Sequence, residues 1–401
     1  MAGMFDRLGV RPVLNAAGTL TRLSGGPIRP EAVEAMAEAA ALCVDMAELQ
    51  AAASRRIAAV TGAEAGYVTP GASSALLLGA AAMIAGLSTA RMARMPQTGD
   101  APAEVVVARS HRNSYDVALR TAGARLVEVG LPDRVSGAGV RDAEPHEYAD
   151  AIGPMTAGIL FVAREGALPS LPEVAAVAQA AGVPVLVDAA AELPPAANLR
   201  RFVAEGADLV CFSGGKAIGG PPASGFLAGR ADLVMSAALQ HLDLDVVADL
   251  WRPPASLVDR ARLAGPPRHG VGRACKIGKE QVAGFLAALD AFVAEGDAPR
   301  HARWRAAVEE IAGGLSGVCG RVELGACGDV EAVPKLALHL PGGAQAARAL
   351  ILALDEGRPR VAVEQGAYRA GTVVFNPVCL GPGEPWRVAE ATRAAMAELA
   401  A

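Results

Sequence analysis

The chain has few aromatic residues, which make up 4% of its 401 positions, and only six cysteines. No two cysteines form a Cys-x-x-Cys pair, and no group of cysteine and histidine has the spacing of a zinc site, so we expect no metal. A disulfide framework is not expected in so long a chain with so few cysteines. Unpaired thiols of this kind are typical of a reducing compartment.

Long apolar segments are missing as well. The longest, residues 75–87, is interrupted by Gly79 and Gly86 and is too short to cross a bilayer. The first residues lack the extended apolar stretch of a secretory signal peptide. We therefore expect a cytoplasmic protein that does not act at a membrane.

Positive charge is not in excess, since 37 lysines and arginines stand against 42 acidic residues and the net charge is −5. Nucleic-acid-binding domains are usually basic, so no nucleic-acid partner is expected. Apolar residues are abundant at 52%. A chain of this composition can bury a large core, which excludes a mainly disordered protein.

Short apolar strands alternate with alanine-rich helical segments over the first 230 residues. This alternation is typical of an α/β fold with a mostly parallel sheet that is covered on both faces. Strands are expected at 65–69, 104–108, 125–129, 158–162, 183–187 and 208–212, and helices within 31–61 and at 73–85, 115–121 and 172–181.

The proline-rich segment 250–274 is expected to cross between two domains. A long helix is expected at 280–293, and residues 320–380 again alternate strands with helices. The expected parts are an N-terminal arm and helix (1–45), a large domain (46–255) and a smaller C-terminal α/β domain (256–401).

Two of the expected strands end in residues that can do chemistry. The apolar run 185–187 leads into Asp188, and the run 208–212 leads through Ser213 and two glycines to Lys216. Ligands of open parallel sheets bind beyond the carboxyl ends of the strands. A helix cap and a solvated loop lysine are the alternatives for these two residues taken singly.

A third feature is the turn at 69–74, Thr-Pro-Gly-Ala-Ser-Ser, between a strand and a helix. The backbone N–H groups of Gly71, Ala72 and Ser73 are expected to point out of the helix N-terminus, where an anion is stabilised. The turn has neither the P-loop spacing nor a complete G-x-G-x-x-G pattern. An anion site, an aspartate and a lysine 28 residues later together suit pyridoxal 5'-phosphate (PLP), which needs partners for its phosphate, pyridine nitrogen and aldehyde.

The order of these motifs resembles the fold type I PLP-dependent enzymes, whose fold is that of aspartate aminotransferase. Within them, the chain is similar to the branch of selenocysteine synthase and D-glucosaminate-6-phosphate ammonia lyase. The resemblance covers nearly the whole chain and rests on residues 13–19, 61–65, 187–195, 212–221 and 276–281, of which SGGKAIGGP with DAAAELPP upstream is the most specific part.

The resemblance implies a role for each site residue. Lys216 would bind the cofactor aldehyde, Asp188 would pair with its pyridine nitrogen, and Ser213 would contact the phosphate together with the turn at Gly71, Ala72 and Ser73. His111 would stack on the cofactor and pass a proton to a leaving hydroxyl. Gly220 would lie by the cofactor in a loop near a subunit interface, which implies a homodimer or larger homo-oligomer with shared active sites.

Three further residues are expected to bind the substrate. Asn15 and Thr19 lie in the N-terminal loop, which often covers the substrate in fold type I enzymes. Arg273 suits a carboxylate or phosphate, because arginine binds both in a bidentate way. For each of them an ordinary structural role is the alternative.

The expected activity is that of a PLP-dependent lyase. It would carry out α,β-elimination on a 2-amino-3-hydroxy acid, such as a phosphorylated amino sugar acid, and release a 2-keto acid and ammonia. Retro-aldol cleavage, racemisation and transamination remain open, because the same residues serve them. Selenium transfer on seryl-tRNA and a non-catalytic scaffold are less favoured, the former because of the acidic charge and the short N-terminal arm.

Overall fold

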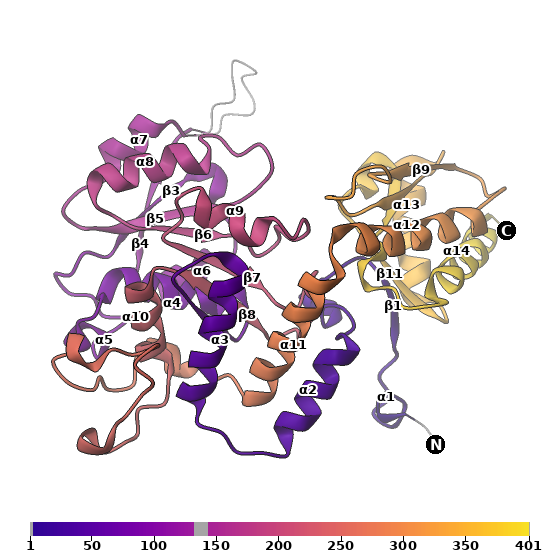
Figure 1. Ribbon diagram of the computed structural model, residues 1–401. Helices are drawn as coiled ribbons and strands as arrows, with labels where there is room; N and C mark the ends of the chain where they lie inside the picture. The colour runs from indigo at the N-terminus through magenta and orange to yellow at the C-terminus, as the bar shows by residue number, and fades with distance from the viewer. Residues whose placement is uncertain (1–2, 132–142, 401) are drawn as a thin grey trace.

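The molecule has a large lobe and a small lobe, which are joined by a pair of helices (Figure 1). The computed structural model describes residues 3–131 and 143–400. The large lobe is built on a seven-stranded sheet in the order β2-β8-β7-β6-β5-β3-β4. Strand β8 runs antiparallel to both its neighbours, and the other pairs are parallel. The strands are β2 (Ala65–Thr69), β3 (Glu104–Ala108), β4 (Arg125–Val129), β5 (Thr156–Val162), β6 (Val185–Asp188), β7 (Leu209–Ser213) and β8 (Gly225–Gly229).

Helices cover both faces of this sheet. One face packs against α4 (Ala72–Ala85), α5 (Thr89–Met92), α6 (Asp116–Thr121) and α10 (Ala231–His241). The other packs against α2 (Pro30–Ala40), α3 (Met46–Thr61), α7 (Pro145–Ala151), α8 (Leu171–Ala181), α9 (Asn198–Ala204) and α11 (Lys279–Glu295). The expected mostly parallel, doubly covered sheet is therefore confirmed.

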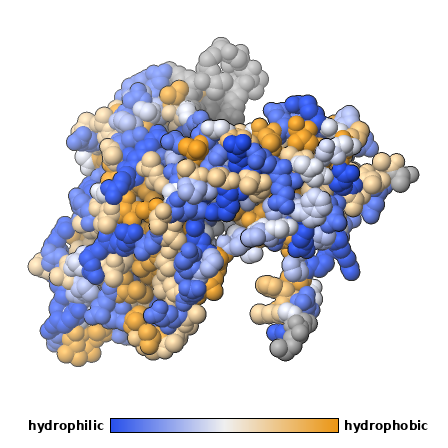
Figure 2. All heavy atoms as spheres, turned by 45° about the vertical axis from the view of Figure 1, so that its right-hand side comes forward, coloured by the Kyte–Doolittle hydropathy of each residue, from blue (hydrophilic) through white to orange (hydrophobic). Residues whose placement is uncertain are grey.

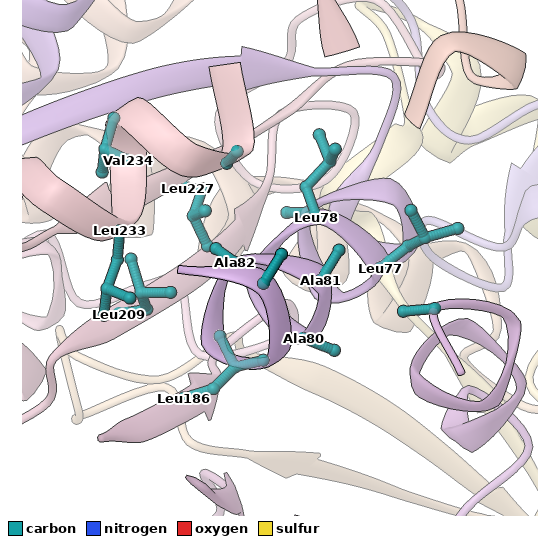
Figure 3. Packing of buried hydrophobic residues seen from close by; sticks show 14 of the residues in the cluster. Leu77, Leu78, Ala80, Ala81, Ala82, Leu186, Leu209, Leu227, Leu233 and Val234 are labelled. Carbon is teal, nitrogen blue, oxygen red and sulfur yellow. The ribbon is translucent and has the colours of Figure 1, made fainter. Parts of the chain in front are cut away.

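The central strands are apolar throughout because both of their faces are buried. In β6, Leu186 points to one core cluster while Val185 and Val187 point to the other, as the alternation of side chains along a strand requires. Figure 3 shows the first cluster, in which Leu186, Leu209 and Leu227 of the sheet lie against the alanines of α4 and against α10. A Cβ at Gly79 would lie 3.0 Å from a methyl group of Leu186, so this glycine lets α4 approach the sheet closely.

The small lobe has its own sheets and core. A three-stranded antiparallel sheet has the order β12-β10-β9, and β1 pairs with β11 in parallel. The elements are β1 (Val13–Ala16), β9 (Arg321–Gly325), β10 (Lys335–His339), β11 (Arg360–Val363), β12 (Thr372–Phe375), α12 (Asp297–Gly314), α13 (Gly343–Glu356) and α14 (Glu384–Ala400), with the short helix α1 (Met4–Arg7) before them.

The division of the core differs from the expected division into 1–45, 46–255 and 256–401. Leu257 and Val258 pack into the core of the large lobe, as does α11 through Phe285. Segment 250–274 thus has apolar side chains in the core of the large lobe, which supports a crossing elsewhere. The N-terminal strand instead adds Leu14 to the core of the small lobe. We propose that the chain crosses between domains near residue 296 and that its N-terminal strand belongs to the small domain.

Candidate active site

A cavity of about 650 Å³ opens at the carboxyl edge of the large sheet. Strands β2, β5, β6 and β7 all end at this edge, because β8 reverses direction between β2 and β7. Loops that follow these strands supply most of the wall, and the N-terminal arm adds one residue. The cavity is lined by Thr21, Pro70, Gly71, Ala72, Ser73, Leu76, Asn113, Ser114, Tyr115, Val162, Ala163, Asp188, Ala190, Ala191, Glu192, Ser213, Lys216, Pro222 and Ala223.

Asp188 is the last residue of β6 and lies beside Cys211 of β7 in the register of the sheet. Its residue exposure is 8%. Oδ1 accepts a hydrogen bond from the Ala190 N–H at 3.1 Å and a weak one from the Cys211 thiol at 3.7 Å. Burial raises the pKa of the Asp188 carboxyl, while the Ala190 N–H and the positive charge of Lys216 oppose the rise. A cationic partner in the cavity would therefore keep this carboxylate ionised.

Lys216 lies three residues beyond the end of β7, in a loop that is fixed by its own backbone. The Gly214 N–H donates to the Ser224 carbonyl, and the Gly220 N–H donates to the Gly214 carbonyl, both at 2.8 Å. A Cβ at Gly215 would lie 2.6 Å from the Pro222 Cα, so this loop requires glycine there. Burial lowers the pKa of the Lys216 amine, and the charge of Asp188 opposes that fall. A lowered pKa gives more of the neutral amine, which is the form that attacks an aldehyde.

The turn for which an anion site is expected leads directly into α4. Gly71 has φ +87° and turns the chain into the helix. Its own N–H donates to the Thr69 carbonyl at 2.8 Å, so the outward donors are those of the first helical turn, which begins at Ala72. Gly225 of β8 pairs with both Thr69 and Ser213, which brings this turn close to Ser213.

These residues fit PLP in three respects. The helix N-terminus suits its phosphate, the buried carboxylate of Asp188 suits a protonated pyridine nitrogen, and the amine of Lys216 suits its aldehyde. Among the described residues that line the cavity, Lys216 is the only cationic side chain. The cavity thus offers one amine for the single aldehyde of the cofactor. It supplies little positive charge for the cofactor phosphate or for a substrate carboxylate.

His111 lies behind the cavity wall. It is 2% exposed and does not appear among the lining residues. Its Nδ1 accepts a hydrogen bond from the Val162 N–H at 3.3 Å, and its ring packs edge-on against Phe161 with the centroids 4.9 Å apart. The structure therefore places His111 beside Val162 and Phe161, and its stacking on the cofactor stays a prediction.

The remaining expected residues also lie outside the cavity wall. Asn15 is buried, and its Nδ2 donates to the carbonyls of Gly18 and Gly25 at 3.0 Å, which fixes the N-terminal loop. Thr19 and Gly220 are not lining residues either. Arg273 lines a separate cavity of about 250 Å³ and pairs with Asp243 at 2.8 Å.

Several lining residues were not expected. Thr21 comes from the N-terminal loop, two positions beyond Thr19, and Asn113 to Tyr115 begin two positions beyond His111. Glu192 follows Asp188 by four residues and is half-buried. Burial raises the pKa of its carboxyl, Arg201 opposes the rise, and Asp188 adds to it. Each of these lining residues lies within a few positions of an expected site residue, and this closeness is the one signal in the sequence that could have found it.

The fold and this site together define a fold type I enzyme of the kind that binds PLP. The model of the SelA family, described as L-seryl-tRNA selenium transferase, matches residues 13–247. The chain belongs to this family.

Two relatives are similar over most of the chain. A D-glucosaminate-6-phosphate ammonia lyase of Salmonella typhimurium is 33% identical over 298 residues, which are 72% of this chain and 70% of that protein. A 5'-C-glycyluridine monooxygenase-decarboxylase of a Streptomyces species is 30% identical over 393 residues, 94% of this chain and 88% of that protein. An L-seryl-tRNA(Sec) selenium transferase of Rhizobium meliloti is 34% identical, but the match spans only 51% of that protein.

Solved structures agree with this assignment. The structure of a D-glucosaminate-6-phosphate ammonia-lyase superimposes with a TM-score of 0.80 and 26% identity over the full length of both chains. A serine palmitoyltransferase of Sphingomonas wittichii has a TM-score of 0.52 and 14% identity over 96% of this chain and 88% of that one, which supports the fold alone. These matches confirm the expected fold class and family.

Two further observations concern the described part of the chain. No helix there is long and apolar enough to cross a bilayer. No group of three or more histidine, cysteine, aspartate or glutamate side chains comes together there in a way that suits a metal ion.

Proposed function

We propose that this protein is a PLP-dependent lyase that eliminates water from a 2-amino-3-hydroxy acid and releases a 2-keto acid and ammonia. The observation that carries the proposal is the meeting of Asp188 and Lys216 in one cavity at the ends of adjacent strands. The similarity to an ammonia lyase over 72% of the chain supports the lyase class. A phosphorylated amino sugar acid is the substrate class that this relative suggests.

PLP supplies an aldehyde that condenses with amines and a pyridine ring that accepts the electron pair left by a departing α-proton. Lys216 would bind the cofactor and then take the proton from Cα of the substrate. Asp188 would keep the proton on the pyridine nitrogen. Ser213 and the first turn of α4, with Ala72 and Ser73, would bind the phosphate, and Gly71 would turn the chain towards it.

The departing hydroxyl needs a proton so that it leaves as water. Glu192 lines the cavity, and its raised pKa favours the protonated form that such a donor requires. His111 lies behind Val162, so we propose that it supports the cavity wall rather than acting as this donor.

We also propose that the protein forms a homodimer or larger homo-oligomer that shares active sites. The cavity has one cationic side chain among its described lining residues, although the phosphate and the substrate carboxylate both need positive charge. Arg273 would then serve the cavity of a neighbouring copy.

An apolar surface on the large lobe also supports association. Figure 2 shows apolar atoms at the lower end of the large lobe, where the loop between α2 and α3 and the segment after α10 lie in Figure 1. Leu42, Val44, Val247 and Leu250 are exposed there.

The first experiment is the visible spectrum of the purified protein with added PLP. We expect a band near ~420 nm that borohydride removes, with the reduced cofactor attached to Lys216. A screen of 3-hydroxy amino acids and amino sugar acids for keto acid and ammonia then tests the lyase assignment. Absence of the band after addition of PLP would exclude the proposal.

A second candidate is an oxidative decarboxylation of an amino acid. It is supported by the relative named as a monooxygenase-decarboxylase, whose similarity spans 94% of this chain. Consumption of O₂ and release of CO₂ would favour this activity, whereas ammonia and keto acid formed without O₂ would favour the lyase. The other open alternatives separate by product: aldehyde and glycine for a retro-aldolase, an inverted amino acid for a racemase, and transfer of the amino group for an aminotransferase.

A further inference from the structure

The junction between α11 and α12 is a cluster of charged residues with little exposure. Here the chain passes from the large lobe to the small one through Gly296, whose φ is +70°. The Arg300 side chain is fully buried, and those of Glu295 and Asp297 are 13% and 23% exposed. Arg300 donates to Glu295 Oε2 at 3.3 Å, to Asp297 Oδ1 at 2.6 Å and to the Phe292 carbonyl at 2.6 Å. The junction is therefore fixed by one guanidinium group that binds both acids.

Arg29 connects this junction to the loop that follows Lys216. Its Nε donates to the Ile218 carbonyl at 2.8 Å, and its backbone N–H donates to the Gly219 carbonyl at 2.9 Å. Its Nη2 pairs with Glu295 at 2.6 Å. A Cβ at Gly219 would lie 2.9 Å from the Arg29 Cγ, so the arginine stem packs directly on this loop. One side chain thus contacts both the junction and the lysine loop.

Asp297 connects the same junction to the loop that follows Asp188. Both of its carboxylate oxygens accept from the Ala196 N–H, at 3.1 and 3.0 Å. Two residues further on, Asn198 Nδ2 donates to the Glu192 carbonyl at 2.7 Å. The loop that contains Glu192 is therefore attached to the first residue of α12.

We propose that Arg29 and Asp297 are positioning residues, through which the junction between the lobes sets the geometry of the loop that bears Lys216 and of the loop that bears Glu192. Within the part of the chain that the structure describes, no hydrogen bond joins the side chains of Lys216 and Asp188. Asp188 is held by β6, whereas the position of Lys216 depends on its loop, which Arg29 ties to Glu295. The loop after Asp188, which contains Glu192, is tied to Asp297. Hydrogen bonds between a charged group and the backbone are among the stronger ones in proteins, so these ties resist displacement.

The test rests on the proposed PLP binding and compares two variants that each remove an arginine from Glu295. Arg29→Met removes the side-chain hydrogen bond to the Ile218 carbonyl and keeps the backbone bond to the Gly219 carbonyl. Arg303→Met is the matched control. Arg303 also pairs with Glu295, but its side chain is 57% exposed. Among the described residues, its hydrogen bond goes to Glu295 and not to the loop that bears Lys216. Three quantities are measured for the full-length protein: the dissociation constant of PLP for the apoprotein, the pH midpoint of the visible band, and the melting temperature.

We expect Arg29→Met to weaken PLP binding about tenfold and to shift the pH midpoint of the band, as the loss of a charge-assisted hydrogen bond predicts. Arg303→Met is expected to leave both unchanged. Equal effects of the two variants on PLP binding and on the midpoint would overturn the proposal. A wild-type protein with no band would instead overturn the proposed function.

Two conservative variants cover the case in which Arg29→Met does not fold. Arg29→Lys keeps the positive charge but offers a single donor group, which cannot serve the Ile218 carbonyl and Glu295 as the arginine fork does. Asp297→Asn keeps an acceptor for the Ala196 N–H, whereas Asp297→Ala does not. The proposal expects a shifted pH midpoint in Arg29→Lys and in Asp297→Ala, and recovery towards the wild-type value in Asp297→Asn. Wild-type midpoints in both Arg29→Lys and Asp297→Ala would overturn it.

Discussion

The Asp188 carboxylate and the Lys216 amine face one cavity from the carboxyl ends of adjacent parallel strands, and each favours the charged form of the other. Burial acts in the opposite sense on both groups, because it disfavours charge. At both groups, burial and the opposite charge of the partner therefore act against each other. Such a balance suits an amine that must be a cation at one stage of a reaction and a base at another.

Replacement of Lys216 tests its attachment to the cofactor. The chain has four lysines, at 216, 276, 279 and 335, so borohydride labelling followed by peptide mass analysis has few possible outcomes. We expect Lys216→Ala to lose the reducible visible band, since no other lysine lines the cavity among the described residues. Lys276→Ala is the control, because Lys276 lines a different cavity. A label on any lysine other than Lys216 in the wild-type protein would contradict this assignment.

The pH dependence of the Lys216 amine follows from its surroundings. In the apoprotein, burial lowers its pKa and Asp188 raises it again. Only the neutral amine reacts with an acylating reagent, so Lys216 should react at a lower pH than an ordinary lysine. In Asp188→Asn the pH midpoint of Lys216 modification should fall further, because the variant loses a negative charge that stabilises the ammonium form. The rate of modification at Lys216 is followed against pH by mass spectrometry.

Asp208→Asn is the matched control for that measurement. Asp208 precedes β7 and accepts from the Val185 N–H at 2.8 Å, at the opposite end of the strands from the cavity. The variant should leave the Lys216 midpoint unchanged. An equal downward shift in both variants would show that the effect is not specific to Asp188.

Gly225 tests the anion site at the start of α4. A Cβ at this position would lie 2.7 Å from the Ala72 nitrogen, so Gly225→Ala must displace the first turn of the helix. We expect a loss of about 1–3 kcal/mol of unfolding free energy, as overpacking causes, together with weaker PLP binding. Gly153→Ala is the control, because a Cβ at Gly153 meets no atom within 4 Å. Urea unfolding and PLP titration of both variants measure the two effects, and wild-type PLP affinity in Gly225→Ala would argue against a phosphate site at this turn.

Glu192 tests the source of the proton for the departing hydroxyl. Burial raises the pKa of its carboxyl, so the protonated form persists to a higher pH than for an exposed glutamate. If Glu192 donates that proton, the rate falls as the pH rises through this pKa. Glu192→Gln should lower kcat by about 10²-fold or more and abolish the limb of the pH profile in which the rate falls with rising pH. Glu205→Gln is the control, since Glu205 pairs with Arg201 in the neighbouring cavity, and an unchanged limb in Glu192→Gln would exclude the role.

The individual elements of the large lobe were predictable because their signal is local. Strands such as Val185–Asp188 are short apolar runs with β-branched residues, and helices such as α4 are alanine-rich between glycines. The placement of Asp188, Lys216 and the turn at Gly71 around one cavity followed from a general rule, since the carboxyl ends of parallel strands meet at one edge.

The positions of some residues relative to the cavity depend on contacts between distant segments. Arg273 has the chemistry of a substrate ligand, yet it pairs with Asp243 beside another cavity. Thr21 reaches the wall because the N-terminal strand pairs with β11, more than 300 residues later in the chain. The sequence around Arg273 and Thr21 contains no local pattern that indicates where these side chains lie relative to the cavity.

The sequence by itself determined the alternating elements, the edge of the sheet at which the cavity opens, and the aspartate and lysine that lie there. Local propensity and strand direction are sufficient for these. The tertiary structure alone decided which lobe α11 joins, which layer His111 occupies, and that Arg29 ties the lysine loop to the junction at Glu295. Those outcomes depend on which apolar faces and which charges meet across long sequence separations, and a single sequence contains no short-range signal for such meetings.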